Sequence, residues 1–341
     1  MRNKLCVIVT YFGTFHPSIV PFIQSCERNP EFDWLFFTDC QYKNLPSNVH
    51  FYNMTLAELK NLIEKKLGDR IVLDRPYKMC DYRPAYGVIF EDYLNKYDFW
   101  GYGDVDVVYG CLSNFITDEL CDQYDKIYPC GHLSFVRNKS EINNIYKRAI
   151  KGTLDYKTVF ADNKPYIFDE YQGINEKLLK HGYRVYGQIE FADIAVRYKN
   201  RFRVADKNTI RLTFPKYPFK KNMPRNYKKQ IFMVESGRAY RVYVKNKKIC
   251  KEEVAYIHYR YKIPCEVIIN QYTDYYVTNT GFVIKTSAVS EQIIDTLNPY
   301  PGAMIEFKES LAADRNAIIS LIGKNKKIRN FIRMFKGLDK V

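Results

Sequence analysis

Apolar runs of strand length alternate with helix signals along the first seventy residues, and this alternation restricts the fold more than any other feature. Residues 5–11 and 34–37 are continuous apolar runs, as expected of buried strands, and residues 49–52 make a third. Pro17 and Ser18 precede an apolar helix pattern, and the capping-box pair Thr55 and Glu58 precedes another. Strands that alternate with helices at short spacing predict an α/β fold: a mostly parallel central sheet with flanking helices.

A pair of acidic residues marks where this sheet would carry out chemistry. Residues 97–103 have the pattern of another buried strand, and Asp104 and Asp106 follow it two positions apart. Residues i and i+2 of an extended chain point to the same side, so the two carboxylates repel each other unless a cation lies between them. Mn²⁺ or Mg²⁺ suits this role because both take oxygen ligands and can also bind a diphosphate. The alternative is that both acids are solvated turn residues.

Polar residues at the ends of other strands predict a nucleotide site beside this pair. In parallel α/β sheets, ligands bind beyond the carboxyl ends of the strands. The residues at such ends are Thr10, Tyr11, Asp39 and Asp104. Asp81 and Arg83 precede a helix predicted to run into residues 90–94, and a helix N-terminus attracts anions. The alternative is that Asp81 caps this helix and Arg83 pairs with a surface acid.

Two later segments supply candidate substrate-binding and catalytic residues. Residues 127–137 are expected to form one strand with Gly131 and His132 near its start. These two residues, together with Trp100, are the candidate substrate-binding residues, although a lone histidine is more often structural. Asp169 and Glu170 precede a helix pattern, where acids either cap the helix or act as a base toward a hydroxyl.

The amino-acid composition of the chain changes from residue 201 onward. Residues 201–250 are basic and aromatic, and two alternating runs around Ser236 and Gly237 predict a β-hairpin that elaborates the sheet. A strand over 254–262 carries His258, with Lys262 four residues later, and a last strand pair is expected within 275–284. We therefore expect a catalytic domain over 1–286 and a helical region over 287–341.

The composition favours a reducing compartment and anionic partners. The nine cysteines are an odd number without a Cys-x-x-Cys pair, so free buried thiols explain them better than zinc or disulfides. No signal peptide is evident, and no apolar run approaches the roughly 18 residues that span a membrane, which predicts a cytoplasmic protein. The 53 basic and 38 acidic residues leave a net charge of +15, which suits nucleotide diphosphates, nucleic acid or an acidic membrane.

Part of this basic excess lies in the C-terminal tail. Seven basic residues and one acid fall within 324–341, and apolar residues recur at helical spacing through the same stretch (Ile328, Phe331, Ile332 and Phe335). A basic amphipathic helix of this kind can lie on an anionic membrane, which would place the protein at the inner face of the membrane. The alternative is a terminal helix packed on the protein's own core.

Taken together, these motifs resemble the GT-A-type nucleotide-sugar glycosyltransferases, including bacterial cell-surface polysaccharide transferases of capsule and lipopolysaccharide synthesis. The resemblance covers most of residues 1–284 and rests on three features: the strand ending in Asp104-Val105-Asp106, the late His258-x-x-x-Lys262, and the segment 78–87 with Asp81 and Arg83. It implies a Mn²⁺ or Mg²⁺ held by Asp104, Asp106 and His258, a UDP-sugar whose diphosphate meets Lys262, and a glycan or lipid-linked acceptor. It also implies that the segment starting at Glu170 faces the sugar.

Two other function classes compete with this interpretation. A nucleic-acid-binding protein would explain the charge and the aromatic residues, but no recognised binding motif is present, so we expect no nucleic-acid partner. A metal-dependent nucleotidyltransferase also uses paired aspartates, and would consume a nucleoside triphosphate and release pyrophosphate.

Overall fold

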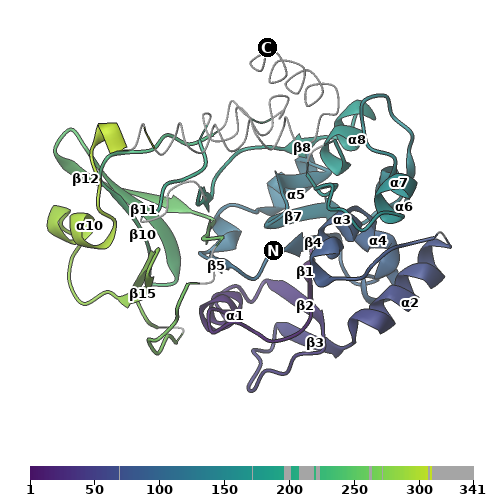
Figure 1. Cartoon of the computed structure of the whole chain (residues 1–341), viewed down its shortest axis with the longest axis horizontal. Coiled ribbons are helices and arrows are strands. Elements are labelled where there is room, and N and C mark those ends of the chain that lie inside the picture. Colours follow the sequence, from purple (N-terminus) through teal and green to yellow (C-terminus); the bar gives the residue numbers. More distant parts are fainter. Residues whose placement is uncertain are drawn as a thin grey trace, which may run out of the picture.

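A seven-stranded sheet forms the centre of the protein (Figure 1). The computed structural model describes residues 1–68, 70–170, 172–195, 201–206, 219, 223–260, 263–270, 272–305 and 308. The strand order is β3-β2-β1-β4-β7-β6-β8, and only β7 runs antiparallel to its neighbours. The strands are β1 Leu5–Tyr11, β2 Phe32–Thr38, β3 Val49–Asn53, β4 Phe99–Gly103, β6 Lys126–Cys130, β7 Leu133–Arg137 and β8 Val185–Tyr186. This arrangement confirms the predicted α/β fold with a mostly parallel central sheet.

Helices cover both faces of this sheet because successive residues of its buried strands point to opposite sides. Cys6 and Ile8 of β1 face a core closed by the helices α2, α4 and α8, whereas Val7 and Val9 face a core closed by α1 and α5. The helices are α1 Ile19–Glu27, α2 Leu56–Leu67, α3 Met79–Tyr82, α4 Tyr86–Ile89, α5 Asp118–Gln123, α6 Ser140–Asn143, α7 Tyr156–Phe160, α8 Ile174–Lys180 and α10 Glu291–Leu297. The 3₁₀ turns are η1 Pro76–Lys78, η2 Arg83–Ala85, η3 Glu91–Tyr93, η4 Leu112–Asn114 and η5 Ile145–Lys147.

A three-stranded sheet, ordered β5-β13-β9, adjoins the end of β4. It consists of β5 Val107–Tyr109, β13 Tyr256–His258 and β9 Ala192–Asp193. In its register His258 lies opposite both Val107 and Asp193. This sheet therefore brings residues that are far apart in the chain next to the Asp104–Asp106 segment.

The predicted hairpin around Ser236 and Gly237 is confirmed, but its strands belong to a separate five-stranded antiparallel sheet, seen in green at the left of Figure 1. Both turn residues have positive φ, 50° and 74°, as a type I′ hairpin requires. The order is β12-β11-β10-β14-β15, with β10 Gln230–Glu235, β11 Arg238–Lys245, β12 Lys248–Val254, β14 Tyr275–Thr278 and β15 Gly281–Ile284. One face packs on α10, and the other packs on β5 and β13.

Two local predictions were wrong, and one of the two alternatives left open for Asp169 and Glu170 is excluded. Residues 127–137 form not one strand but the hairpin β6–β7, whose turn contains Gly131 and His132. The helix expected to run into 90–94 is replaced by the short helices α3 and α4 and the 3₁₀ turns η2 and η3. Pro84 lies in η2 and lacks the N–H that a continuous helix needs there. Asp169 and Glu170 do not cap α8, which begins at Ile174 with Gly173 at the N-cap position.

Two sequence expectations about the chain as a whole can also be compared with the structure. All nine cysteines fall within the described residues and are free thiols, but only Cys6, Cys26 and Cys121 are buried as predicted, and the other six are partly exposed. Within the described residues, no helix combines the length and the apolar character needed to cross a membrane. The basic tail over 324–341 lies outside the described residues.

Candidate active site

The carboxyl ends of β1, β2 and β4 meet at one edge of the central sheet, as the sequence predicted. In the parallel pairing of β1 with β4, Ile8 lies opposite Tyr102, so Thr10 and Asp104 come to the same edge. The Thr10 hydroxyl is 2.9 Å from the hydroxyl of Tyr86. Asp39, just after β2, accepts a hydrogen bond of 2.8 Å from the N–H of Gly13, and the Tyr11 hydroxyl donates to the carbonyl of Thr14.

Asp104, Asp106 and His258 form a cluster at this edge. His258 Nε2 lies 3.4 Å from Asp106 Oδ1 and 3.9 Å from Asp104 Oδ2. The pairing of β13 with β5 explains this convergence, because Asp106 directly precedes β5 and accepts a backbone hydrogen bond of 3.0 Å from Tyr259. The two carboxylates are partly exposed and the imidazole is buried. One ligand atom from each residue lies within 4.8 Å of the others.

The charges of this cluster stabilise one another. Burial alone would raise the pKa of Asp104, but the positive charges of Arg83 and His258 outweigh it and lower the pKa to about 2. Burial alone would lower the pKa of His258, but Asp106 and Asp193 raise it to about 9. A protonated His258 therefore takes the place of a cation between the carboxylates, and a metal ion at this site would have to replace that proton.

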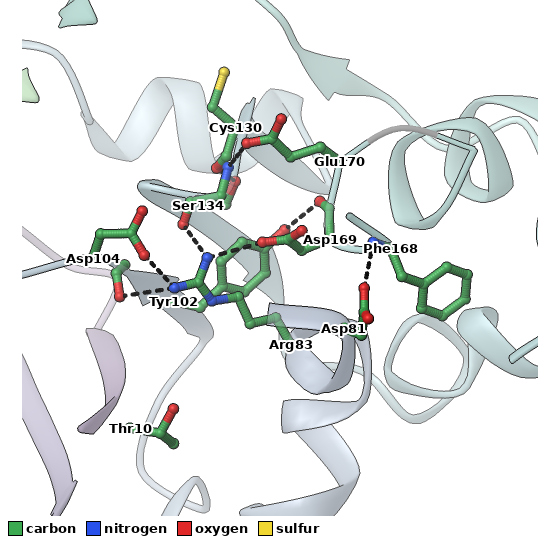
Figure 2. Close-up of polar contacts among 12 residues, drawn as sticks. Thr10, Asp81, Arg83, Tyr102, Asp104, Cys130, Ser134, Phe168, Asp169 and Glu170 are labelled. Carbon is green, nitrogen blue, oxygen red and sulfur yellow. Dashed lines mark hydrogen bonds and ion pairs between the residues drawn. The ribbon is translucent and has the colours of Figure 1, made fainter. Parts of the chain in front are cut away.

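The guanidinium of Arg83 lies between Asp104 and Asp169 and contacts four groups (Figure 2). Its Nη2 donates to Asp104 and, at 3.4 Å, to the carbonyl of Gly103. Its Nη1 donates to the carbonyl of Gly131 at 3.0 Å and to Asp169 Oδ2 at 2.9 Å. Arg83 belongs to the η2 turn, and the Cζ atom of its guanidinium lies 5.6 Å from the centroid of the Tyr102 ring. Arg83 thus pairs with the buried Asp169 and the partly exposed Asp104 of the site rather than with an isolated surface acid.

The carboxylates of Asp169 and Glu170 both lie next to Gly131. Glu170 Oε1 accepts a hydrogen bond of 2.5 Å from the N–H of Gly131. A Cβ atom at Gly131 would lie 2.5 Å from Asp169 Oδ2 and 2.9 Å from Arg83 Nη1, so no larger residue fits without moving this pair. Burial raises the pKa of Asp169 to about 7 in spite of the charge of Arg83, and burial likewise raises the pKa of Glu170.

Two predicted site residues prove to be structural. The Asp81 carboxylate is buried, bonded to Lys78 at 2.8 Å and to the N–H groups of Tyr166 and Phe168, so it holds that backbone and is closed to a nucleotide. Trp100 is fully buried and donates to Asn143 Oδ1 at 2.7 Å, which contradicts its predicted contact with substrate. Lys262 lies outside the described residues.

His132 occupies a buried position behind His258. The two rings stack with centroids 4.2 Å apart, and the Tyr256 hydroxyl bonds to His132 Nδ1 at 2.9 Å. Sequence reasoning missed Asp193 and Arg260, which lie next to this pair and bond to each other. The only available signal was an acid within the apolar run around 191–195, and such an acid has many structural explanations.

Comparison with known proteins adds a family to this geometry. The sequence model of a family of unknown function, DUF6625, matches residues 7–286. The chain belongs to this family. No curated protein matches the sequence. Among solved structures, the chain is similar to the galactosyltransferase LgtC in complex with donor and acceptor sugar analogues, at 12% identity and a TM-score of 0.38, covering 65% of this chain and 84% of that one.

The donor set of the cluster fits a small divalent cation. Two carboxylates and one imidazole nitrogen are ligands that Mn²⁺ and Mg²⁺ accept, and the partial exposure of Asp104 and Asp106 leaves room for further oxygen ligands. A second trio, His132, Asp193 and His258, is just as close together. Arg260 already binds both oxygens of Asp193, however, so this second trio is the poorer cation site.

Proposed function

We propose that this protein is a metal-dependent glycosyltransferase that moves a sugar from a nucleoside-diphosphate sugar to a hydroxyl group. The donor that we propose is a UDP-sugar. The single observation that supports this function most is the convergence of Asp104, Asp106 and His258 at the carboxyl edge of the parallel strands, with Arg83 behind them. We assign the catalytic unit to residues 1–286.

In this proposal, Asp104, Asp106 and His258 hold Mn²⁺ or Mg²⁺. The bound cation supplies positive charge that stabilises the diphosphate as the bond to the sugar breaks. Arg83 keeps Asp104 ionised and oriented toward the cluster, and Thr10, Tyr11 and Asp39 line the edge where the nucleotide binds. Lys262, four residues after His258, adds a second cation for the diphosphate.

Glu170 is our candidate for the group that accepts a proton from the acceptor hydroxyl in an inverting reaction. Asp169 is buried, and Arg83 engages one of its oxygens. Glu170 is partly exposed, and its raised pKa makes it a better base than an ordinary surface glutamate. The N–H of Gly131 donates to Glu170 and so fixes the orientation of its carboxylate. His132 then supports the site from behind His258 rather than binding the sugar directly.

The acceptor that we propose is a glycan or a lipid-linked sugar at the cytoplasmic face of a membrane. This part of the proposal rests on the sequence, namely the basic amphipathic pattern over 324–341. It explains how the enzyme would meet a membrane-bound acceptor.

A thermal-shift screen tests the donor. Nucleoside-diphosphate sugars with Mn²⁺ should raise the unfolding temperature more than either alone, because a ligand of the folded state stabilises it by mass action. Release of a nucleoside diphosphate from the best donor would then show turnover. Stabilisation by nucleoside triphosphates with release of pyrophosphate would favour a nucleotidyltransferase, and salt-sensitive binding of random single-stranded RNA without sugar-nucleotide binding would favour a nucleic-acid-binding protein.

A further inference from the structure

We propose that Asp193 positions His258 as a metal ligand and that Arg260 holds Asp193 in place for this task. The inference rests on the proposed function, because it concerns the metal that Asp104, Asp106 and His258 would hold. It assigns a role to two residues that the site description left without one.

The two nitrogens of His258 face different partners. Nδ1 lies 2.8 Å from Asp193 Oδ1, whereas Nε2 faces Asp106 at 3.4 Å. When Nδ1 donates its hydrogen to Asp193, the lone pair of a neutral imidazole remains on Nε2 and points at the Asp104–Asp106 side. Metal-binding histidines are commonly oriented in this way by a carboxylate on the second nitrogen.

Arg260 fixes Asp193 through two parallel contacts. Its Nε donates to Oδ1 at 2.6 Å and its Nη2 to Oδ2 at 2.5 Å, a bidentate pair that restricts rotation of the carboxylate. The backbone of Arg260 has a φ of 57°, so the chain leaves the extended conformation of β13 two residues after His258. The register of β13 with β9 then sets His258 beside Asp193.

The ring face of His258 is restrained as well. His132 stacks on it at 4.2 Å, and His132 is in turn held by the Tyr256 hydroxyl. His258 is therefore held at one nitrogen and over one face, while its second nitrogen is directed at the carboxylates. This is the arrangement expected of a preoriented ligand rather than of a histidine that merely fills the core.

Manganese binding measured by electron paramagnetic resonance, with no sugar donor present, tests the proposal. Asp193→Ala should weaken Mn²⁺ binding by about 10- to 100-fold, the usual cost of losing such a supporting carboxylate. Asp193→Asn keeps an oxygen that can accept from Nδ1 and should lose less. The matched control is Asp33→Ala, which removes a carboxylate 3.5 Å from His50 near the start of β2, at the opposite edge of the sheet, and should leave Mn²⁺ binding unchanged.

The variant Arg260→Gln distinguishes positioning from charge, and it provides a second test if Asp193→Ala does not fold. If only charge mattered, removal of this nearby cation would tighten Mn²⁺ binding. If Arg260 positions Asp193, the same change should weaken Mn²⁺ binding.

Each result has a distinct meaning. Equal losses in the Ala and Asn variants of Asp193, or tighter binding by Arg260→Gln, would overturn the positioning role. The positioning role would also be overturned if the wild-type protein bound Mn²⁺ no more tightly than Asp193→Ala does. That result would not contradict the metal site itself. Wild-type protein that binds neither Mn²⁺ nor Mg²⁺ would overturn the metal assignment and this inference with it.

Discussion

Replacing Arg83 with methionine is the sharpest test of how the site is held together. Methionine has a similar length and no charge, so the change removes the guanidinium without opening a large cavity. It leaves Asp169, whose side chain is only 3% exposed, without its cation, and it leaves the Gly131 carbonyl without that donor. Asp104 is less affected because about a third of its side chain, 32%, remains in solvent.

The size of the effect follows from this burial. Removing one partner of a buried ion pair typically costs about 3–5 kcal/mol of unfolding free energy. Asp169 can reduce the penalty by taking up a proton, which its pKa of about 7 already allows. We therefore expect a loss near 3 kcal/mol at pH 6 and a larger one at pH 8. A chain of this size loses about 2 °C of unfolding midpoint per kcal/mol. A loss of about 3–5 kcal/mol therefore corresponds to a fall of about 6–10 °C in the midpoint.

Thermal or urea unfolding at the two pH values measures this loss. Arg238→Met is the matched control, because Arg238 pairs with Glu253 at the surface and should change the midpoint little. The double variant Arg83→Met/Asp169→Leu should be more stable than Arg83→Met, since it no longer buries an unpaired carboxylate. If Arg83→Met unfolds at the wild-type midpoint at pH 8, or if the double variant gains nothing, the reasoning about this buried pair is wrong.

Four further predictions concern the same site and the tail. Burial raises the pKa of Asp169 above the roughly 3.9 of an unfolded aspartate, so the folded state binds more protons than the unfolded state between about pH 4 and 7. The free energy of unfolding should therefore fall as pH rises through this window. Asp169→Asn should reduce this pH dependence in urea titrations. Gly131→Ala should lower sugar transfer by about 10²-fold, because its Cβ displaces Asp169 and Arg83; normal turnover would contradict this. Asp106→Asn and His258→Ala should each abolish Mn²⁺-dependent stabilisation by the donor, and Asp106→Asn should also lose a little stability as His258 loses an ion-pair partner; undiminished metal dependence would exclude these ligands. A chain cut after Gly323 should still bind donor but no longer sediment with anionic liposomes, whereas full-length protein that ignores such liposomes at low salt would refute the membrane role of the tail.

Local patterns were sufficient to predict several elements. The capping box of Thr55 and Glu58 forms as expected at the start of α2, because all its atoms lie within one turn of chain. The hairpin turn at Ser236 and Gly237 is equally local, since it depends on two adjacent residues, of which Gly237 adopts positive φ without steric cost. The apolar runs of β1 and β2 predicted buried parallel strands, and from these followed the shared edge of Thr10, Asp39 and Asp104.

Other elements could not be read from local pattern. The turn at Gly131 and His132 lies inside a run that is apolar on both sides, so nothing in its period distinguishes one long strand from two. The burial of Asp81 was also hidden, because its backbone partners lie more than eighty residues further along the chain.

The chain by itself determined the α/β architecture and the acidic pair after β4, because strand periodicity and the same-side geometry of residues i and i+2 are properties of neighbouring residues. Only the tertiary structure decided which groups surround that pair. Pairing of β5, β13 and β9 brings His258 and Asp193 to Asp106 from about 150 and 90 residues away. Such pairings depend on packing across the whole sheet, and a residue type alone does not reveal its distant partner.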